Sequence, residues 1–198
     1  MMADVNKETK TAEDIATYIE KMDTIKCPDS FKMNFLTNHD ENSWNGTEYE
    51  RYGKGVEAFA VLTYTLNGMP MIYTGQEVGL KKRLSFFDKD MVPSWTENAT
   101  TKFYKKLNEL KHSNNALLAG DGGEFRRYQT SANKELLIFS RKQGGKEIMV
   151  LLNLSDKNIK YASNDALNLG GYTDYFSGAK VDEIPTSLKA WEYRVLVK

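Results

Sequence analysis

The sequence predicts an α+β protein in which alternating helices and strands precede an antiparallel β-sandwich. Up to about residue 111 the periodic segments follow the order helix, strand, helix, strand, helix, which is typical of βα units around a parallel sheet. From Phe125 onward, short apolar or alternating segments are separated by turn-forming residues, as in a sandwich. We therefore divide the 198 residues into a polar, disordered leader at 1–10, a helix-and-strand part at 11–112 and an all-β domain at 113–198.

Three helices are predicted in the first part from the spacing of apolar residues. The first is capped by Thr11 and has one apolar stripe, made by Ile15, Tyr18, Ile19 and Met22. The second runs over residues 52–66, is apolar around much of its circumference and stops at Asn67-Gly68, so we expect it to be covered on more than one side. The third covers residues 98–111 and keeps most of its charged side chains on one solvated face.

Two strands alternate with these helices. Residues 31–37 place Phe31, Met33 and Phe35 on one face, and residues 69–73 form a second short apolar run with a proline near its start. In the all-β domain, Gly144-Gly145 marks the clearest hairpin turn.

Composition narrows the classes of function. Lys+Arg and Asp+Glu both number 27, so no net field favours nucleic acid or an anionic membrane, and we expect a neutral partner. No run reaches the ~18 apolar residues of a membrane span, and the first ten residues lack the apolar stretch of a signal peptide. The single cysteine, Cys27, excludes an intramolecular disulfide and a cysteine zinc site. We predict no cofactor, and localisation stays open.

His39 and Asp40 follow the first predicted strand directly. In parallel βα architectures the catalytic groups lie at the carboxyl ends of strands, where loops vary while the sheet beneath holds them. A carboxylate there can stabilise positive charge or accept hydrogen bonds from sugar hydroxyls, and an imidazole can donate one more. Trp44 offers a flat apolar face for a pyranose ring. These three residues are the candidate site.

The same residues also have other interpretations. A His-Asp pair in a loop can simply be a turn with a solvated carboxylate. A metal-dependent phosphohydrolase would need several histidines, but only His112 accompanies His39, so we predict no metal site. A Ser-His-Asp triad lacks a Gly-x-Ser-x-Gly elbow, and residues 75–79 lack the lysine of a phosphate loop.

The candidate site is accompanied by further motifs in a fixed order. FLTNHDE at 35–41 is followed by a helix, GMPMIYTGQEVG at 68–79, Phe-Phe-Asp at 86–88, a tryptophan, FYKKLNELKHSNNAL at 103–117 and an all-β tail. This series resembles the last third of enzymes of the alpha-amylase family (glycoside hydrolase family 13). The resemblance implies a C-terminal fragment of a (β/α)₈ barrel, with strand seven at 31–37 and strand eight near 69–73, and a C-terminal sandwich.

The resemblance also implies roles for the site residues. Asp40 matches the third catalytic carboxylate, which holds hydroxyls of the sugar ring being cleaved, and His39 matches a histidine that binds the same ring. The family's retaining mechanism needs two further carboxyl groups about 5 Å apart, and no segment of this sequence matches their motifs. A complete barrel also takes roughly 250 residues. We therefore expect a parent enzyme active on α-1,4-linked glucans, and no turnover by this chain alone.

Two further expectations concern partners. Strands without their barrel neighbours expose backbone edges, which must be covered. The chain can self-associate through residues 31–37 and 69–73, or its βα units can collapse against the sandwich in a non-barrel arrangement. For an isolated chain we favour the collapse. A different class of function also stays open. In that alternative the chain is a non-catalytic carbohydrate-binding or interaction module that grips a glycan with Trp44 or Trp191.

Overall fold

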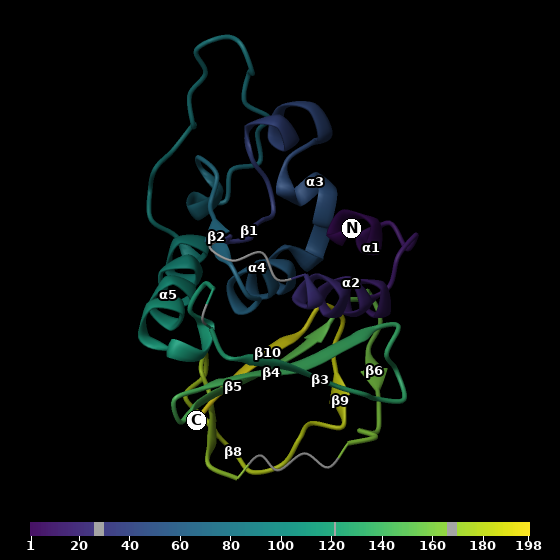
Figure 1. Cartoon of the computed structure of the whole chain (residues 1–198). Coiled ribbons are helices and arrows are strands. Elements are labelled where there is room, and N and C mark those ends of the chain that lie inside the picture. Colours follow the sequence, from purple (N-terminus) through teal and green to yellow (C-terminus); the bar gives the residue numbers. More distant parts are fainter. Residues whose placement is uncertain (26–29, 121, 166–169) are drawn as a thin grey trace.

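The computed structural model describes residues 1–25, 30–120, 122–165 and 170–198. The helices gather on one side of a six-stranded sheet, and the long segment before α5 extends away from that sheet (Figure 1). The helices are α1 (Met2–Asn6), α2 (Ala12–Thr24), α3 (Glu48–Tyr52), α4 (Val56–Thr65) and α5 (Ala99–Ser113). The predicted mixture of helices with an antiparallel sheet is confirmed.

The six-stranded sheet has the order β3-β4-β5-β10-β7-β8, and all its neighbouring strands are antiparallel. Gly144 and Gly145 connect β4 to β5 with φ of 55° and 79°, a left-handed pair that suits glycine and makes the predicted hairpin. Two smaller sheets pair β1 with β2 and β6 with β9. The strands are β1 (Met33–Phe35), β2 (Met69–Met71), β3 (Glu124–Tyr128), β4 (Leu136–Gln143), β5 (Lys146–Asn153), β6 (Ile159–Lys160), β7 (Tyr172–Asp174), β8 (Lys180–Val181), β9 (Ser187–Leu188) and β10 (Tyr193–Val197).

β1 and β2 are the two strands expected in the first part. They pair in parallel, with Met33 opposite Met69 and Phe35 opposite Met71. A parallel pair needs a crossover between its strands, and α3 and α4 supply it. The alternation of helices and strands in the sequence is typical of a parallel sheet, and β1 and β2 pair in parallel.

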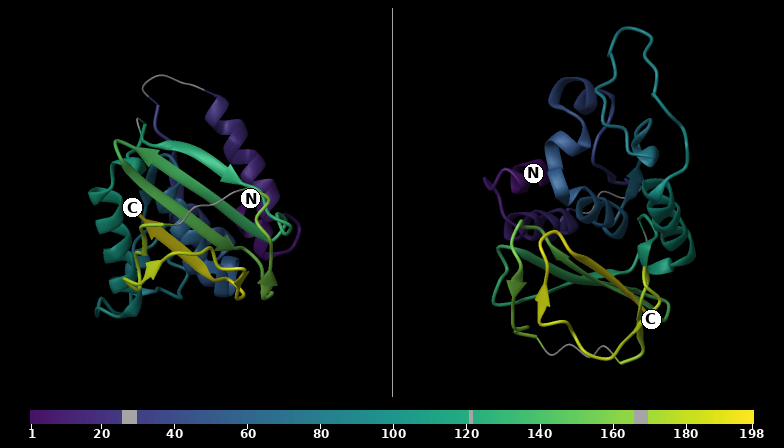
Figure 2. Two further views of the ribbon diagram at one scale, coloured as in Figure 1. Left: turned by 90° about the horizontal axis from the view of Figure 1, so that it is seen from below. Right: turned by 180° about the vertical axis from the view of Figure 1, so that it is seen from behind.

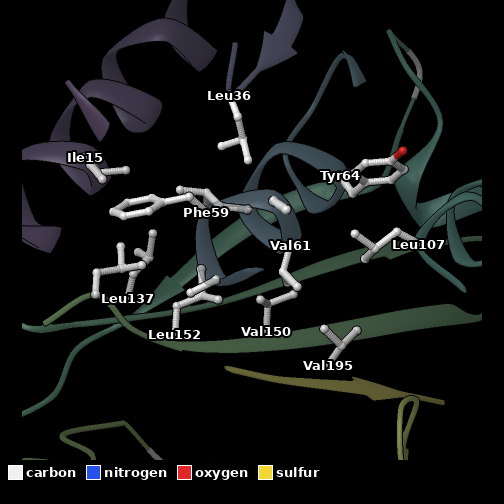
Figure 3. Close-up of a cluster of buried hydrophobic side chains, with 14 of the residues drawn as sticks. Ile15, Leu36, Phe59, Val61, Tyr64, Leu107, Leu137, Val150, Leu152 and Val195 are labelled. Carbon is white, nitrogen blue, oxygen red and sulfur yellow. The ribbon is translucent and has the colours of Figure 1, made fainter. Parts of the chain in front are cut away.

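The six-stranded sheet is buried on both faces, which explains the continuous apolar runs of β4 and β5. Alternate residues point to opposite faces of a strand. One face, which includes Leu137, Phe139, Val150, Leu152 and Val195, packs under the helices (Figure 3). The other face, which includes Leu136, Ile138, Met149, Leu151 and Leu196, packs against the region of β6 and β9. Figure 2 shows the sheet between these two layers from two further sides.

Helix α4 is the centre of the first layer. Every residue of α4 except Glu57 is buried, as its apolar circumference predicts. Phe59 packs on Tyr52 and Trp191, with ring centroids 5.3 and 6.0 Å away. At Gly55 a Cβ would lie 2.7 Å from the Trp191 ring, so this position needs glycine. The first part of the chain thus shares one core with the sheet.

The amino-terminal residues differ from the expectation of a disordered leader. Residues 2–6 form helix α1, and Val5 is buried in the main core. Asn6 Nδ2 donates to the Arg51 carbonyl at 3.2 Å. Val5 is apolar enough to pack despite its polar neighbours, so the prediction of disorder is wrong for this segment. The cap predicted at Thr11 is present, because its hydroxyl accepts from the Asp14 amide in a capping box.

Candidate functional site

The candidate site lies on the turn that follows β1. Asn38 begins this turn: its side chain accepts from the Glu41 amide at 2.7 Å and its carbonyl accepts from the Asn42 amide at 2.9 Å. Asp40 has helical backbone angles and precedes a short π-helix at Glu41–Asn45. The chain therefore leaves the strand and turns at once, which presents the side chains of His39 and Asp40 at the head of the turn.

His39 and Asp40 lie side by side and are open to solvent. His39 Nε2 is 3.5 Å from Asp40 Oδ2, and the two side chains are 66% and 57% exposed. This separation is long for a hydrogen bond. The His39 ring nitrogens and the acceptor oxygens of the Asp40 carboxylate consequently keep hydrogen-bonding capacity that a polar ligand could use.

The turn is held in place by buried polar contacts rather than by the exposed pair. Asn42 is buried; its amide group donates to the Lys82 carbonyl at 3.2 Å and accepts from the Leu84 amide at 2.7 Å. Ser43 adds a bond to the Leu84 carbonyl at 2.7 Å. These contacts tie the site to residues 82–84, some 40 positions later in the chain. A fixed turn of this kind limits the entropy lost when a ligand binds.

Charged pairs support both ends of the turn. Arg51 bonds Glu41 at 2.9 Å and the Leu36 carbonyl at 2.9 Å, which links the turn to the end of β1. Arg83 binds Glu50 through two contacts of 3.0 and 2.9 Å. The hydrogen bond from Arg83 and that from the Thr47 amide lower the pKa of Glu50 to about 2. Glu50 is therefore ionised at neutral pH and serves as a cap for α3 and an anchor for Arg83.

A cluster of aromatic rings lies beside His39. The Phe86 ring lies 5.7 Å from His39 and 5.3 Å from Trp44, and Phe87 lies 4.9 Å from Phe86. Trp44 is 58% exposed, so its ring is accessible from solvent. Phe86 and Phe87 were not among the site residues predicted from the sequence. Two adjacent phenylalanines in a polar loop are the signal that points to them.

Other residues considered from the sequence lie elsewhere. Trp191 is half-buried against Phe59, which makes it a packing residue. His112 is exposed in the last turn of α5. Across the described ranges, no three His, Cys, Asp or Glu side chains gather where a metal ion could be held. Cys27 lies outside the described residues. None of the helices that the structure describes is long and apolar enough to cross a bilayer.

The fold places the candidate residues after a parallel strand, and a comparison with family models assigns the chain to a family. The model of the alpha-amylase catalytic domain matches residues 2–116, which is more than half of the chain. This chain belongs to the alpha-amylase family.

Several relatives and solved structures are similar to this chain. A cyclomaltodextrin glucanotransferase from Klebsiella oxytoca is 24% identical over 197 residues, covering 85% of this chain and 29% of that protein. Alpha-amylase 2 from Dictyoglomus thermophilum is 26% identical over 160 residues, covering 74% of this chain and 26% of its own length. The structure of the maltogenic alpha-amylase AmyB from Thermotoga neapolitana superimposes with a TM-score of 0.80 at 18% identity, over 98% of this chain and 48% of that one.

The match to AmyB includes both the helices and the sheet, because it covers nearly the whole chain. The fold of this chain is therefore similar to that of the matching part of the solved structure. The chain spans about half the length of that structure and less than a third of the two sequence relatives.

Proposed function

We propose that this chain carries part of the sugar-binding site of an enzyme that acts on α-1,4-linked glucans, by hydrolysis or by glucosyl transfer. The observation that carries the proposal is the exposed, adjacent placement of His39 and Asp40 at the head of a turn after a parallel strand. In this site Asp40 accepts hydrogen bonds from hydroxyls of the ring being cleaved and favours the positive charge of an oxocarbenium-like transition state. His39 donates to the same ring, and Trp44 packs on its apolar face.

We extend the proposal to the architecture. β1 and β2 correspond to strands seven and eight of a (β/α)₈ barrel, α5 is the last barrel helix, and residues 113–198 form the C-terminal sandwich domain. The parallel pairing of β1 with β2 and the family match over residues 2–116 support this division. The barrel part of this chain then includes α1 as well as residues 11–112, because α1 packs into the same core.

The proposal places the bond-breaking step outside this chain. Retaining glycoside hydrolysis requires a nucleophilic carboxylate and a carboxylic acid about 5 Å apart. No segment of this sequence matches the motifs of those two groups. Asp40 alone can hold and polarise a sugar but cannot form the glycosyl intermediate or protonate the leaving oxygen.

Titration calorimetry with a maltooligosaccharide tests this function. Asp40→Asn is expected to weaken binding roughly 10-fold or more, because a charge-assisted hydrogen bond contributes about 1.5–3 kcal/mol. His39→Ala should also weaken it, whereas Asp156→Asn on an exposed turn of the β-rich part should bind as the wild type does. A reducing-sugar assay should detect no hydrolysis by the chain alone. Hydrolysis that Asp40→Asn abolishes would contradict the assigned roles.

A second function is favoured by the exposure of Trp44 and its ring neighbours. The chain could serve as a non-catalytic carbohydrate-binding module that uses Trp44 without the polar pair. The same calorimetry separates the two functions: affinity that survives both His39→Ala and Asp40→Ala but falls in Trp44→Ala indicates the module. Trp191 is less suited to this role because Phe59 and Gly55 pack against it.

We also propose that the chain self-associates through the β1–β2 pair. Met33 and Met69 lie opposite each other in register and are 56% and 46% exposed. A strand pair with open edges and exposed apolar side chains is a template for further pairing. Light scattering at increasing protein concentration should show a mass above that of the monomer, and Met33→Lys should restore the monomer. The exposed Met91→Lys is the matched control, and a monomeric wild type would contradict the proposal.

A further inference from the structure

The segment between the 3-10 turn at Gln76–Val78 and α5 forms a long loop at residues 80–97. It extends beyond the rest of the molecule, at the top of Figure 1. Large apolar side chains are usually buried, yet this loop exposes several of them to solvent. They are Phe86, Phe87, Met91 and Trp95.

The base of this loop is fixed to the candidate site. Leu84 is buried, and its amide and carbonyl bond Asn42 and Ser43 of the site turn at 2.7 Å each. Arg83 binds Glu50 through two contacts, as described above. The loop and the site turn are therefore joined by hydrogen bonds at residues 82–84, shortly before the two phenylalanines.

Asp90 bonds several residues within the loop. Its carboxylate accepts from the Ser85 amide at 3.0 Å and from the Met91 amide at 2.8 Å, and it pairs with Lys82. Ser85 also bonds Asp88 through its hydroxyl at 3.2 Å. These bonds close residues 85–91 into a compact turn that carries Phe86 and Phe87 on its outside.

The two phenylalanines continue the ring cluster of the site. Phe86 contacts both His39 and Phe87, so the rings form a series from the polar pair outward, and Trp44 contacts both phenylalanines at 5.3 and 6.2 Å. Phe87 is 83% exposed at the end of this series. We propose that Phe86 and Phe87, which continue outward from Trp44, form a platform for the glucan residues next to the ring held by His39, Asp40 and Trp44. This inference rests on the proposed function and adds a determinant of chain length to it.

The chemistry of the platform favours a neutral glucan. Pyranose rings present apolar C–H faces that pack on aromatic rings, while their hydroxyls stay solvated at the edges. Charges of both signs border the platform: Lys82 pairs with Asp90, and Asp88 and Lys89 follow Phe87 in the chain, so no field of a single sign attracts an ionic ligand. Rigid aromatic side chains also lose little conformational entropy on binding. The platform is continuous with the polar pair through Phe86, so one extended chain can contact both.

Calorimetry with maltooligosaccharides of increasing length tests the platform. Phe87→Ala should weaken binding roughly three- to tenfold for the longer oligosaccharides and leave the affinity for the shortest bound sugar unchanged. Phe87 is exposed, so the variant should fold, and an unchanged unfolding midpoint will establish this. Met91→Ala, an exposed change in the same loop, should bind every oligosaccharide as the wild type does.

The outcomes separate the two proposals. Equal affinity of Phe87→Ala and wild type for the longest oligosaccharide overturns the platform while the site at His39 and Asp40 stands. An equal loss at every length also overturns it, because the loop would then affect the first sugar only. Absence of binding by the wild type overturns both the platform and the proposed function.

Discussion

Phe59→Ala is expected to lower the free energy of unfolding by about 3–5 kcal/mol, the usual cost of removing a buried aromatic ring. Phe59 is fully buried at the centre of α4, and it contacts Tyr52 of α3 and Trp191 before β10. The ring therefore joins the helices to the sheet. Small domains have total stabilities of about 5–15 kcal/mol, so this single change should remove a large share of the stability.

Urea unfolding followed by circular dichroism measures this effect. Phe87→Ala is the matched control, because it removes the same ring from a position that is 83% exposed, and it should change stability by less than about 0.5 kcal/mol. A small effect of Phe59→Ala would mean that α4 does not hold the two layers together. Two separate transitions in the wild type would mean that the layers unfold independently, against the shared core.

Glu48→Gln is expected to stabilise the protein above neutral pH. Glu48 is 2% exposed at the start of α3, and neither carboxylate oxygen has a hydrogen-bond partner among the described residues. Burial raises the pKa of Glu48 to about 8 from an ordinary 4.5. The neutral acid is therefore the form that the fold prefers.

The sign of the pH dependence follows from the raised pKa. The contribution of Glu48 to the free energy of unfolding is fully present below pH 4.5 and is lost as the pH rises toward 8. In this range Glu48 is ionised in the unfolded chain but must stay protonated in the folded one, so a rising pH favours unfolding. The loss is on the order of 3–5 kcal/mol at about 1.4 kcal/mol per pH unit. Glutamine stays neutral, so Glu48→Gln should differ little from wild type near pH 4.5 and be more stable at pH 8 and above.

Unfolding curves measured from pH 5 to 9 check this prediction. Glu109→Gln, an exposed change on α5, should show the same change in the free energy of unfolding with pH as the wild type. Parallel profiles for wild type and Glu48→Gln would show that Glu48 is solvated or paired. A binding partner that supplies a cation to Glu48 would flatten the wild-type profile in its presence, since a paired carboxylate recovers its charge.

The order of elements was predictable because each depends on local spacing. Neighbouring residues alone predict three of these features. They are the cap at Thr11, the two strands before His39 and near Met69, and the hairpin at Gly144-Gly145. Their boundaries were less accurate. The single helix predicted over residues 52–66 is divided by a 3-10 turn at Gly53–Gly55, where Trp191 from the distant carboxyl-terminal part packs against Gly55.

The helix at the amino terminus was missed for a related reason. Residues 1–10 contain too few apolar side chains to predict a helix, and α1 forms because Val5 reaches a core made by other segments. Tertiary packing overrides weak local propensity in such cases. The burial of Glu48 was likewise invisible, because a glutamate in a first helical turn is ordinarily solvated.

The sequence by itself determined the family, the parallel strand pair and the identity of His39, Asp40 and Trp44 as candidates, because motif and periodicity are local properties. Only the tertiary structure decided what surrounds them. Asn42 and Ser43 bond a segment some 40 residues away, and that contact places Phe86 beside His39. Contacts between distant segments depend on how the layers pack, and spacing along the chain does not encode them.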